Sequence, residues 1–166
     1  MHRAHRMLRH TVTDHRSVAR AFPTAGLAAI ERAIAAGERM HRGQVCFAVE
    51  GALPPLRVLR KLTPRERALE VFGLLGVWDT EENAGVLIYL LLADRDVEIV
   101  ADRGIDRQVD VGTWQAICTR MEAAFAQARY VDGVVEGIRE ISALLATHFP
   151  HAGAIGNELP DRPVVL

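Results

Sequence analysis

The apolar run GVLIYLLLA at residues 85–93 constrains the fold of this 166-residue chain more than any other feature. Its hydrophobic residues occupy both alternating sets of positions, so a strand built from it has no face suited to water. The run is also much shorter than the roughly 20 apolar residues that a membrane-spanning helix needs. It therefore predicts a central β-strand covered on both faces, which places the chain in the α/β class.

Two further strands are predicted around this one. The segment QVCFAVE at 44–50 is rich in β-forming residues, and 96–101 returns from a tight turn at Asp94-Arg95. A helix is expected between the first two strands, because Thr63-Pro64-Arg65-Glu66 combines a capping residue, a proline at the first helical position and a glutamate three residues after the cap. The first two strands then form a right-handed parallel crossover, and the last two an antiparallel hairpin.

The remaining predicted elements are helices, which cover both faces of a small mixed sheet. We expect helices over 8–22, 24–42, 111–128 and 131–149, with Thr24 as an N-cap, a loop over 51–62 that contains at most a short helical turn, and no regular element in 151–166. This predicts a helical arm at 1–22, an α/β domain at 23–150 and a tail at 151–166 that packs on the domain.

The distribution of charge and the positions of the two cysteines limit the kinds of function expected of this chain. The net charge of -1 gives no reason to expect nucleic acid as a partner. Residues 1–21 carry five arginines against Asp14 alone, which predicts a helix solvated on one side or, alternatively, peripheral contact with an anionic membrane or a partner. Cys46 and Cys118 lie in apolar contexts without CxxC spacing and are expected to be buried thiols. The N-terminal stretch lacks the apolar region of a secretory signal, so we expect a cytoplasmic protein.

The predicted topology brings polar residues from distant segments to one edge of the sheet. The first residues of the two parallel strands and the last residue of the third lie at the same end, which places Gln44, Asn83 and Asp102 near one another. The loops 76–83 and 102–107 border this edge. The candidate cation ligands there are Asp79, Thr80, Asn83, Asp102 and Asp106.

Such a cluster has two interpretations. Neighbouring carboxylates repel one another unless a cation neutralises them, and hard oxygen ligands suit Ca²⁺ or Mg²⁺. Alternatively, Asp79 and Thr80 simply turn the chain, and Asp102 accepts hydrogen bonds from backbone amides of the Gly104 turn. The sequence contains no GxGxxG, Walker or GxSxG motif and no EF-hand loop, so nucleotide-binding and serine-hydrolase chemistry are not indicated.

These segments together resemble the TPM domain family. The pieces that match are HRGQVCFAVE (41–50), WDTEENAGVLIYLLLADR (78–95), VEIVADRGID (97–106), Trp114, YVDGVVEGI (130–138) and NELPD (157–161). The resemblance covers most of residues 24–161. It implies an α/β/α sandwich, and it implies either an acid phosphatase, as some members are described, or a domain that binds divalent cations without known catalysis.

The resemblance also bears on individual residues. It carries a site role over to Asn83 and Asp102, with Thr80 adjoining, and it brings in Glu158 and Asp161 if the tail folds back to the same edge. Related sequences usually have glutamate where Gln44 stands, so one carboxylate of the family's pattern is missing here.

Two functions follow as hypotheses. The first is a noncatalytic binding or interaction module, stabilised by Ca²⁺ or Mg²⁺ and with a protein partner still to be identified. The second is a metal-assisted phosphatase acting on phosphate monoesters. In it Asp102 or Asp79 serves as nucleophile or metal ligand, and Arg103 or Arg107 balances the phosphoryl charge.

Overall fold

A four-stranded mixed sheet forms the centre of the molecule. The computed structural model describes residues 2–151 and 156–166. The strand order is β3-β2-β1-β4, with β1 (Gln44–Glu50) parallel to β2 (Gly85–Leu91) and β3 (Asp96–Ala101) antiparallel to β2. The mixed α/β sheet predicted from the sequence is confirmed, and the bounds of β1 and β3 agree with the prediction.

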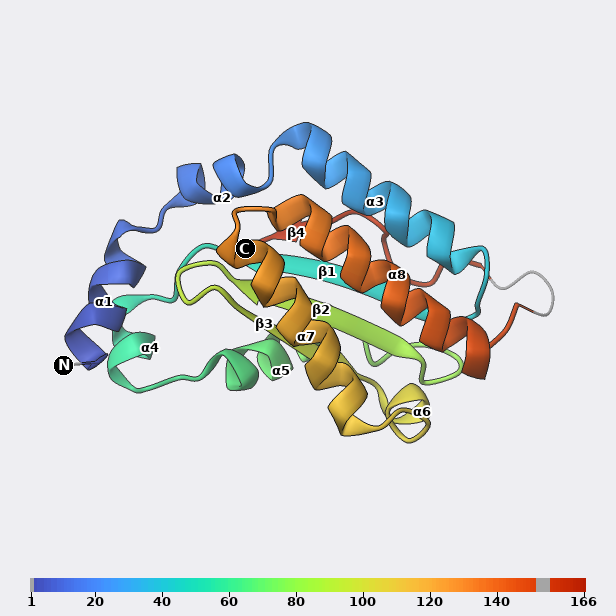
Figure 1. Ribbon diagram of the computed structural model, residues 1–166. Helices are drawn as coiled ribbons and strands as arrows, with labels where there is room; N and C mark the ends of the chain where they lie inside the picture. Colours follow the sequence, from blue (N-terminus) through green and yellow to red (C-terminus); the bar gives the residue numbers. More distant parts are fainter. Residues whose placement is uncertain (1, 152–155) are drawn as a thin grey trace.

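Helices cover both faces of this sheet, so the α/β/α sandwich is also confirmed (Figure 1). One face carries α3 (Thr24–Glu38), α7 (Val111–Ala126) and α8 (Tyr130–His148). The other carries α4 (Pro55–Leu59) and α5 (Pro64–Leu74). Every residue of β1 and β2 is buried, as the apolar run at 85–93 requires.

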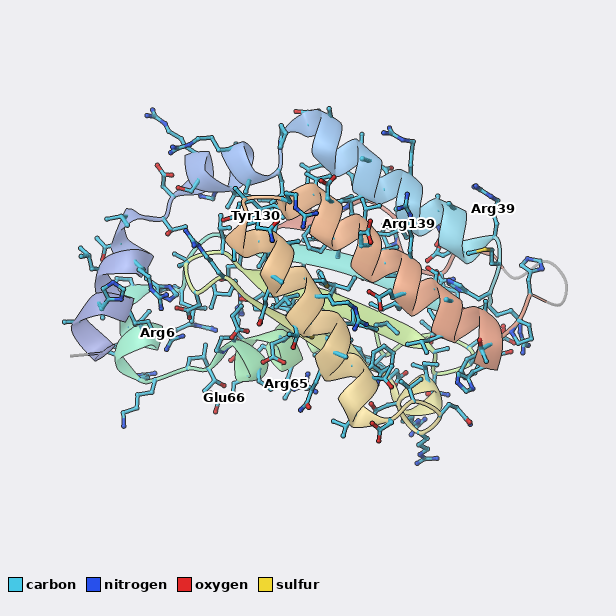
Figure 2. All side chains as sticks on the ribbon, viewed as in Figure 1. Arg6, Arg39, Arg65, Glu66, Tyr130 and Arg139 are labelled. Carbon is cyan, nitrogen blue, oxygen red and sulfur yellow. The ribbon has the colours of Figure 1, made fainter. Side chains whose placement is uncertain are left out.

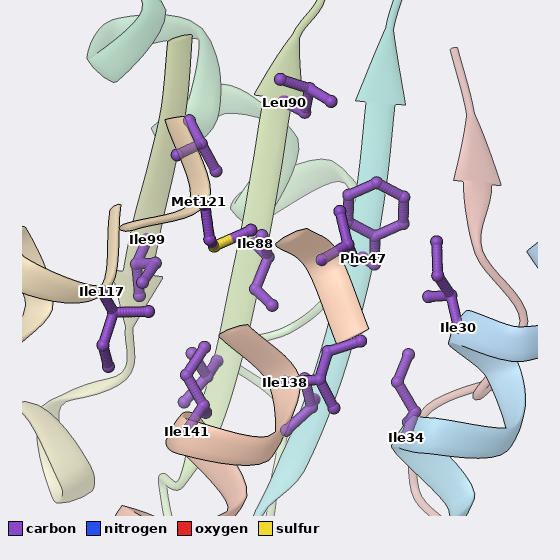
Figure 3. Close-up of a cluster of buried hydrophobic side chains, with 14 of the residues drawn as sticks. Ile30, Ile34, Phe47, Ile88, Leu90, Ile99, Ile117, Met121, Ile138 and Ile141 are labelled. Atoms are coloured by element: carbon purple, nitrogen blue, oxygen red, sulfur yellow. The ribbon is translucent and has the colours of Figure 1, made fainter. Parts of the chain in front are cut away.

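Alternate residues of β2 enter two separate hydrophobic clusters. Ile88 and Leu90 pack with Phe47 of β1 and with Ile30, Met121 and Ile138 of the helices (Figure 3). Leu87 and Tyr89 pack toward α5 on the opposite face. The Tyr89 hydroxyl and Arg67 Nε donate to Glu50 Oε2 at 2.7 and 2.8 Å, and Arg67 Nη2 donates to Oε1 at 3.2 Å. Both oxygens of the buried Glu50 carboxylate are therefore paired.

The N-terminal region differs from the prediction of one helix over 8–22. It forms α1 (His2–Val12) and α2 (His15–Ala21), separated at Asp14, whose side chain accepts the Ser17 N–H as an N-cap. An N-cap residue adopts an extended backbone, which ends one helix where the next begins. Within the next helix, Pro23 and not Thr24 takes the N-cap position, and the helix ends at Glu38, four residues before the predicted end.

Asp94, in the turn between β2 and β3, ties α1 to the sheet. Arg6 Nε and Arg9 Nη2 each donate to its carboxylate at 2.9 Å. His10 Nδ1 accepts the Leu53 N–H at 2.9 Å, so the ring proton lies on Nε2, which is 3.2 Å from Asp94 Oδ1. The long-range pairing explains why α1 holds its place although its own sequence is strongly polar.

The structure contains two short elements that the sequence did not predict. The predicted loop 102–107 contains α6 (Arg103–Asp106), capped by Asp102. The tail, expected to lack regular structure, contains β4 (Val164–Val165), which pairs in parallel with Ala48 and Val49 of β1. Such a short strand forms because β1 offers an open edge, and local propensity gives no sign of it. None of the described helices has the length and apolar composition required to cross a membrane.

Gly85 is required by a close approach of the chain. A Cβ built at this position would lie 2.0 Å from the Val77 carbonyl oxygen, a backbone atom that cannot move aside. We expect Gly85→Ala to lower the free energy of unfolding by about 1–3 kcal/mol, as overpacked cores do, measured by urea unfolding. Gly73→Ala is the matched control, because a Cβ there meets no atom within 4 Å and alanine is favoured in a helix. Equal stability of the two variants would contradict this account.

Candidate functional site

The ends of three strands meet at one rim of the sheet. Gln44 of β1 pairs with Gly85 of β2, and its N–H donates to the Ala84 carbonyl at 3.1 Å. The Asp102 N–H, just after β3, donates to the Gly85 carbonyl at 2.8 Å. We call the rim the end of the sheet formed by Gln44, the loop 76–84, residues 102–106 and the tail segment 157–161.

The loop 76–84 is shaped by its own hydrogen bonds. Thr80 Oγ1 accepts the Ala84 N–H at 3.1 Å, and Asn83 adopts a left-handed backbone with φ of 53°. The Asn83 carbonyl accepts the Gly104 N–H at 2.9 Å, an approach that a side chain at 104 would block, since its Cβ would lie 2.5 Å from that carbonyl oxygen. The Thr80 hydroxyl is therefore used to hold the loop.

Arg103 forms hydrogen bonds with both Asn83 and Asp102. Arg103 Nε donates to Asn83 Oδ1 at 3.1 Å, and Asp102 Oδ1 accepts the Arg103 N–H at 2.7 Å as the cap of α6. The second carboxylate oxygen, Asp102 Oδ2, is buried and has no hydrogen-bond partner among the described residues. A buried carboxylate oxygen without a partner is rare, because its desolvation is not repaid.

Gln44 binds the tail. Its Oε1 accepts the N–H groups of Glu158 and Leu159, both at 3.0 Å, and the residue is only 4% exposed. Glu158 Oε2 in turn accepts the Glu81 N–H at 2.9 Å, so the tail also bridges to the loop. Burying a neutral amide at this position avoids the free-energy cost of burying a charged carboxylate, which accounts for glutamine at position 44.

The remaining predicted ligands do not join one group. Asp79 and Asp106 are exposed. Asp161 accepts a hydrogen bond from Asn157 Nδ2 at 2.5 Å and lies beside Glu38. Among residues 2–151 and 156–166, no group of three or more His, Cys, Asp or Glu side chains is arranged to hold a metal ion.

Two titratable residues next to the rim were missed. Glu38 Oε1 accepts the Val45 N–H at 3.1 Å, and burial followed by the neighbouring Asp161 raises the pKa of Glu38 to about 8. Burial lowers the pKa of His41 to about 4, and its Nδ1 lies 3.0 Å from the Gly43 carbonyl. Both residues line a cavity of about 270 Å³ that Gln44 also borders. The spacing Ile30, Ile34, Glu38 was a usable signal, since it places a carboxylate in line with the buried face of α3.

Comparison with known proteins identifies relatives of the whole domain. Residues 16–144 match the family described as TPM domain. The structure is similar to the NMR structure of the BA42 protein from the psychrophilic bacterium Bizionia argentinensis, with a TM-score of 0.77 and 26% sequence identity over 87% of this chain and 94% of that one. A search of curated proteins found no match.

The raised pKa of Glu38 predicts a pH-dependent stability. Between the ordinary value of 4.5 and about 8 the folded state holds one more proton than the unfolded state, so the free energy of unfolding falls as pH rises through this window. The slope is at most about 1.4 kcal/mol per pH unit. Glu38→Gln keeps the acceptor for Val45 and removes the titration, so we expect a flatter profile and a more stable protein at pH 8 in urea unfolding. Glu31→Gln, an exposed position on the same helix, should leave the profile unchanged.

Proposed function

This chain belongs to the TPM domain family, and on that premise we propose that it works as a binding module whose ligands meet the rim, with Ca²⁺ or Mg²⁺ stabilising Asp102. The observation that carries the proposal is the buried, unpartnered oxygen Asp102 Oδ2. Such an oxygen favours a cation or a hydrogen-bond donor supplied from outside the chain.

The donor atoms around Asp102 are compatible with a weak cation site. Ca²⁺ accepts carboxylate, amide and backbone carbonyl oxygens together with water, so a site does not need three carboxylates. Asp102 and Asn83 are the side chains that would hold the ion. Asn83 Oδ1 already accepts a hydrogen bond from Arg103, whose positive charge opposes a cation and keeps the expected affinity low.

The rim and the adjoining end of α5 together offer a surface for a protein partner. Trp78 is 54% exposed and Leu74 is 74% exposed, and Asp79 and Glu81 beside them form no ion pair among the described residues. Tryptophan is enriched among residues that dominate binding energy in interfaces. We therefore assign the partner a surface that combines basic and apolar side chains.

Calcium titration tests the cation. Binding to the folded state alone raises the midpoint of thermal unfolding, by roughly 3–6 °C when the ion is at ten times its dissociation constant. We expect this shift in the metal-free wild-type protein and its loss in Asp102→Asn, which keeps the cap of α6. Asp132→Asn, on exposed α8 surface, should retain it. Equal shifts in wild type and Asp102→Asn would remove the cation from the proposal.

The same variants separate binding from catalysis. Arg103 beside Asp102 is the observation that favours the second candidate, a metal-assisted phosphatase of phosphate monoesters. Turnover of p-nitrophenyl phosphate by wild type with Ca²⁺ or Mg²⁺, lost in Asp102→Asn and kept in Asp132→Asn, would establish the phosphatase. No turnover in wild type leaves the binding module.

Photo-crosslinking tests the partner surface. A benzophenone amino acid at position 78 is expected to capture a partner in cells, and the same group at exposed position 132 is expected not to capture it. Because the partner is basic, Glu81→Lys should reduce capture severalfold through like-charge repulsion. Capture that is indifferent to Glu81→Lys, or equal at both positions, would contradict the assignment.

A further inference from the structure

A cavity of about 710 Å³ lies at the end of the sheet opposite the rim. Its floor is the turn that follows β2, including Leu92 and Arg95, and its walls come from α1, α2 and the start of α8. Tyr130 stands at the start of α8 on the side that faces α2, where its ring lies 5.9 Å from Phe22 (Figures 1 and 2). Three segments that are distant in sequence therefore border one open cavity.

The lining of this cavity is cationic. It includes Arg9, Arg20 and Arg95, and no carboxylate of the described residues lines it. Arg9 is held in place by its Nη2 bond to Asp94, while its Nε is buried with no partner. Arg20 and Arg95 form no ion pair with any described residue, so their charges remain available to a ligand.

The neighbouring acid does not cancel this charge. Asp94 accepts hydrogen bonds from both Arg6 and Arg9, so these three residues together keep one net positive charge. Arg20 and Arg95 add two further positive charges. Arg95 also holds a left-handed backbone with φ of 54°, a conformation that asparagine or glycine adopts more readily. An arginine at this position keeps a guanidinium at the cavity at some conformational cost.

Part of the remaining lining is apolar and suits an organic group, while Thr13 and Ser17 add two hydroxyls. Val12, Ala21, Leu92 and Ala93 border the same space, and the volume is much larger than one phosphate requires. Guanidinium groups match the oxygens of a phosphoryl group in paired hydrogen bonds. We infer that this cavity binds the phosphoryl group of an organic phosphate, with the apolar wall holding the remainder of the molecule.

That chemistry has two sources, a soluble phosphate ester and a phospholipid headgroup. Leu8 and Val12 of α1 are 60% and 65% exposed, and Val12 also lines the cavity. Exposed apolar residues beside arginines are the arrangement by which helices lie on anionic membranes. Both sources place the same phosphoryl group against Arg9, Arg20 and Arg95, so one set of variants tests them together.

The experiment compares the full-length wild-type chain with a double variant, Arg20→Gln with Arg95→Gln. The matched control is Arg32→Gln with Arg139→Gln, which removes the same charge from exposed positions on α3 and α8 that do not line this cavity. Figure 2 shows Arg139 on α8. Glycerol 3-phosphate is titrated by calorimetry, and phosphatidylcholine vesicles with and without phosphatidic acid are tested by sedimentation. Circular dichroism and thermal unfolding establish that the variants are folded, as expected for exposed arginines.

We expect at least one phosphoryl probe to bind wild type, with the double variant at least tenfold weaker and the control within twofold of wild type. Binding of glycerol 3-phosphate identifies a soluble ligand, and binding restricted to phosphatidic acid vesicles identifies a lipid headgroup. No binding of either probe by wild type would overturn the inference. Equal weakening in the double variant and the control would overturn it as well, because net charge alone would then explain the effect.

Discussion

Burial of β1 and β2 on both faces is the constraint on which the rest of the structure depends. Since neither strand has a face for solvent, helices must cover the sheet from two sides, and α3, α7 and α8 oppose α4 and α5. The interior is thereby filled with side chains, and the helices close both faces of β1 and β2 to ligands. Parallel pairing of β1 with β2 then gathers their first residues at one end and the β2–β3 turn at the other.

Elements with a strong local pattern were predictable, and those that rest on tertiary contacts were not. The strands at 44–50 and 96–101 and the helix start at Thr63-Pro64 show their type through composition and capping residues. By contrast, β4 is two residues long and exists because β1 has an open edge. The break at Asp14 could have been read from Asp14-His15-Arg16-Ser17, where an aspartate precedes a serine at the capping distance.

The candidate site likewise combines a feature that was predictable from the sequence with features that depend on tertiary contacts. Topology alone predicted that Gln44, Asn83 and Asp102 lie at one end of the sheet, because strand direction determines which ends meet. Side-chain partners depend on details beyond topology. Gln44 turns to the N–H groups of Glu158 and Leu159, and Arg103 takes the Asn83 oxygen, so the polar residues form two hydrogen-bonded groups and not a ring of free carboxylates.

The net charge of -1 conceals a separation of charge along the sheet. Exposed carboxylates at Asp79, Glu81, Asp106 and Glu158 lie along the rim beside Arg103, while Arg9, Arg20 and Arg95 line the cavity at the far end beside Asp94. Strands of seven residues hold these ends roughly 20 Å apart. That separation is more than twice the screening length of about 8 Å at physiological salt. Exposed charges at the two ends are therefore largely screened from one another, so the cation or basic partner proposed at the rim and the phosphoryl group proposed at the far end would bind with little mutual effect.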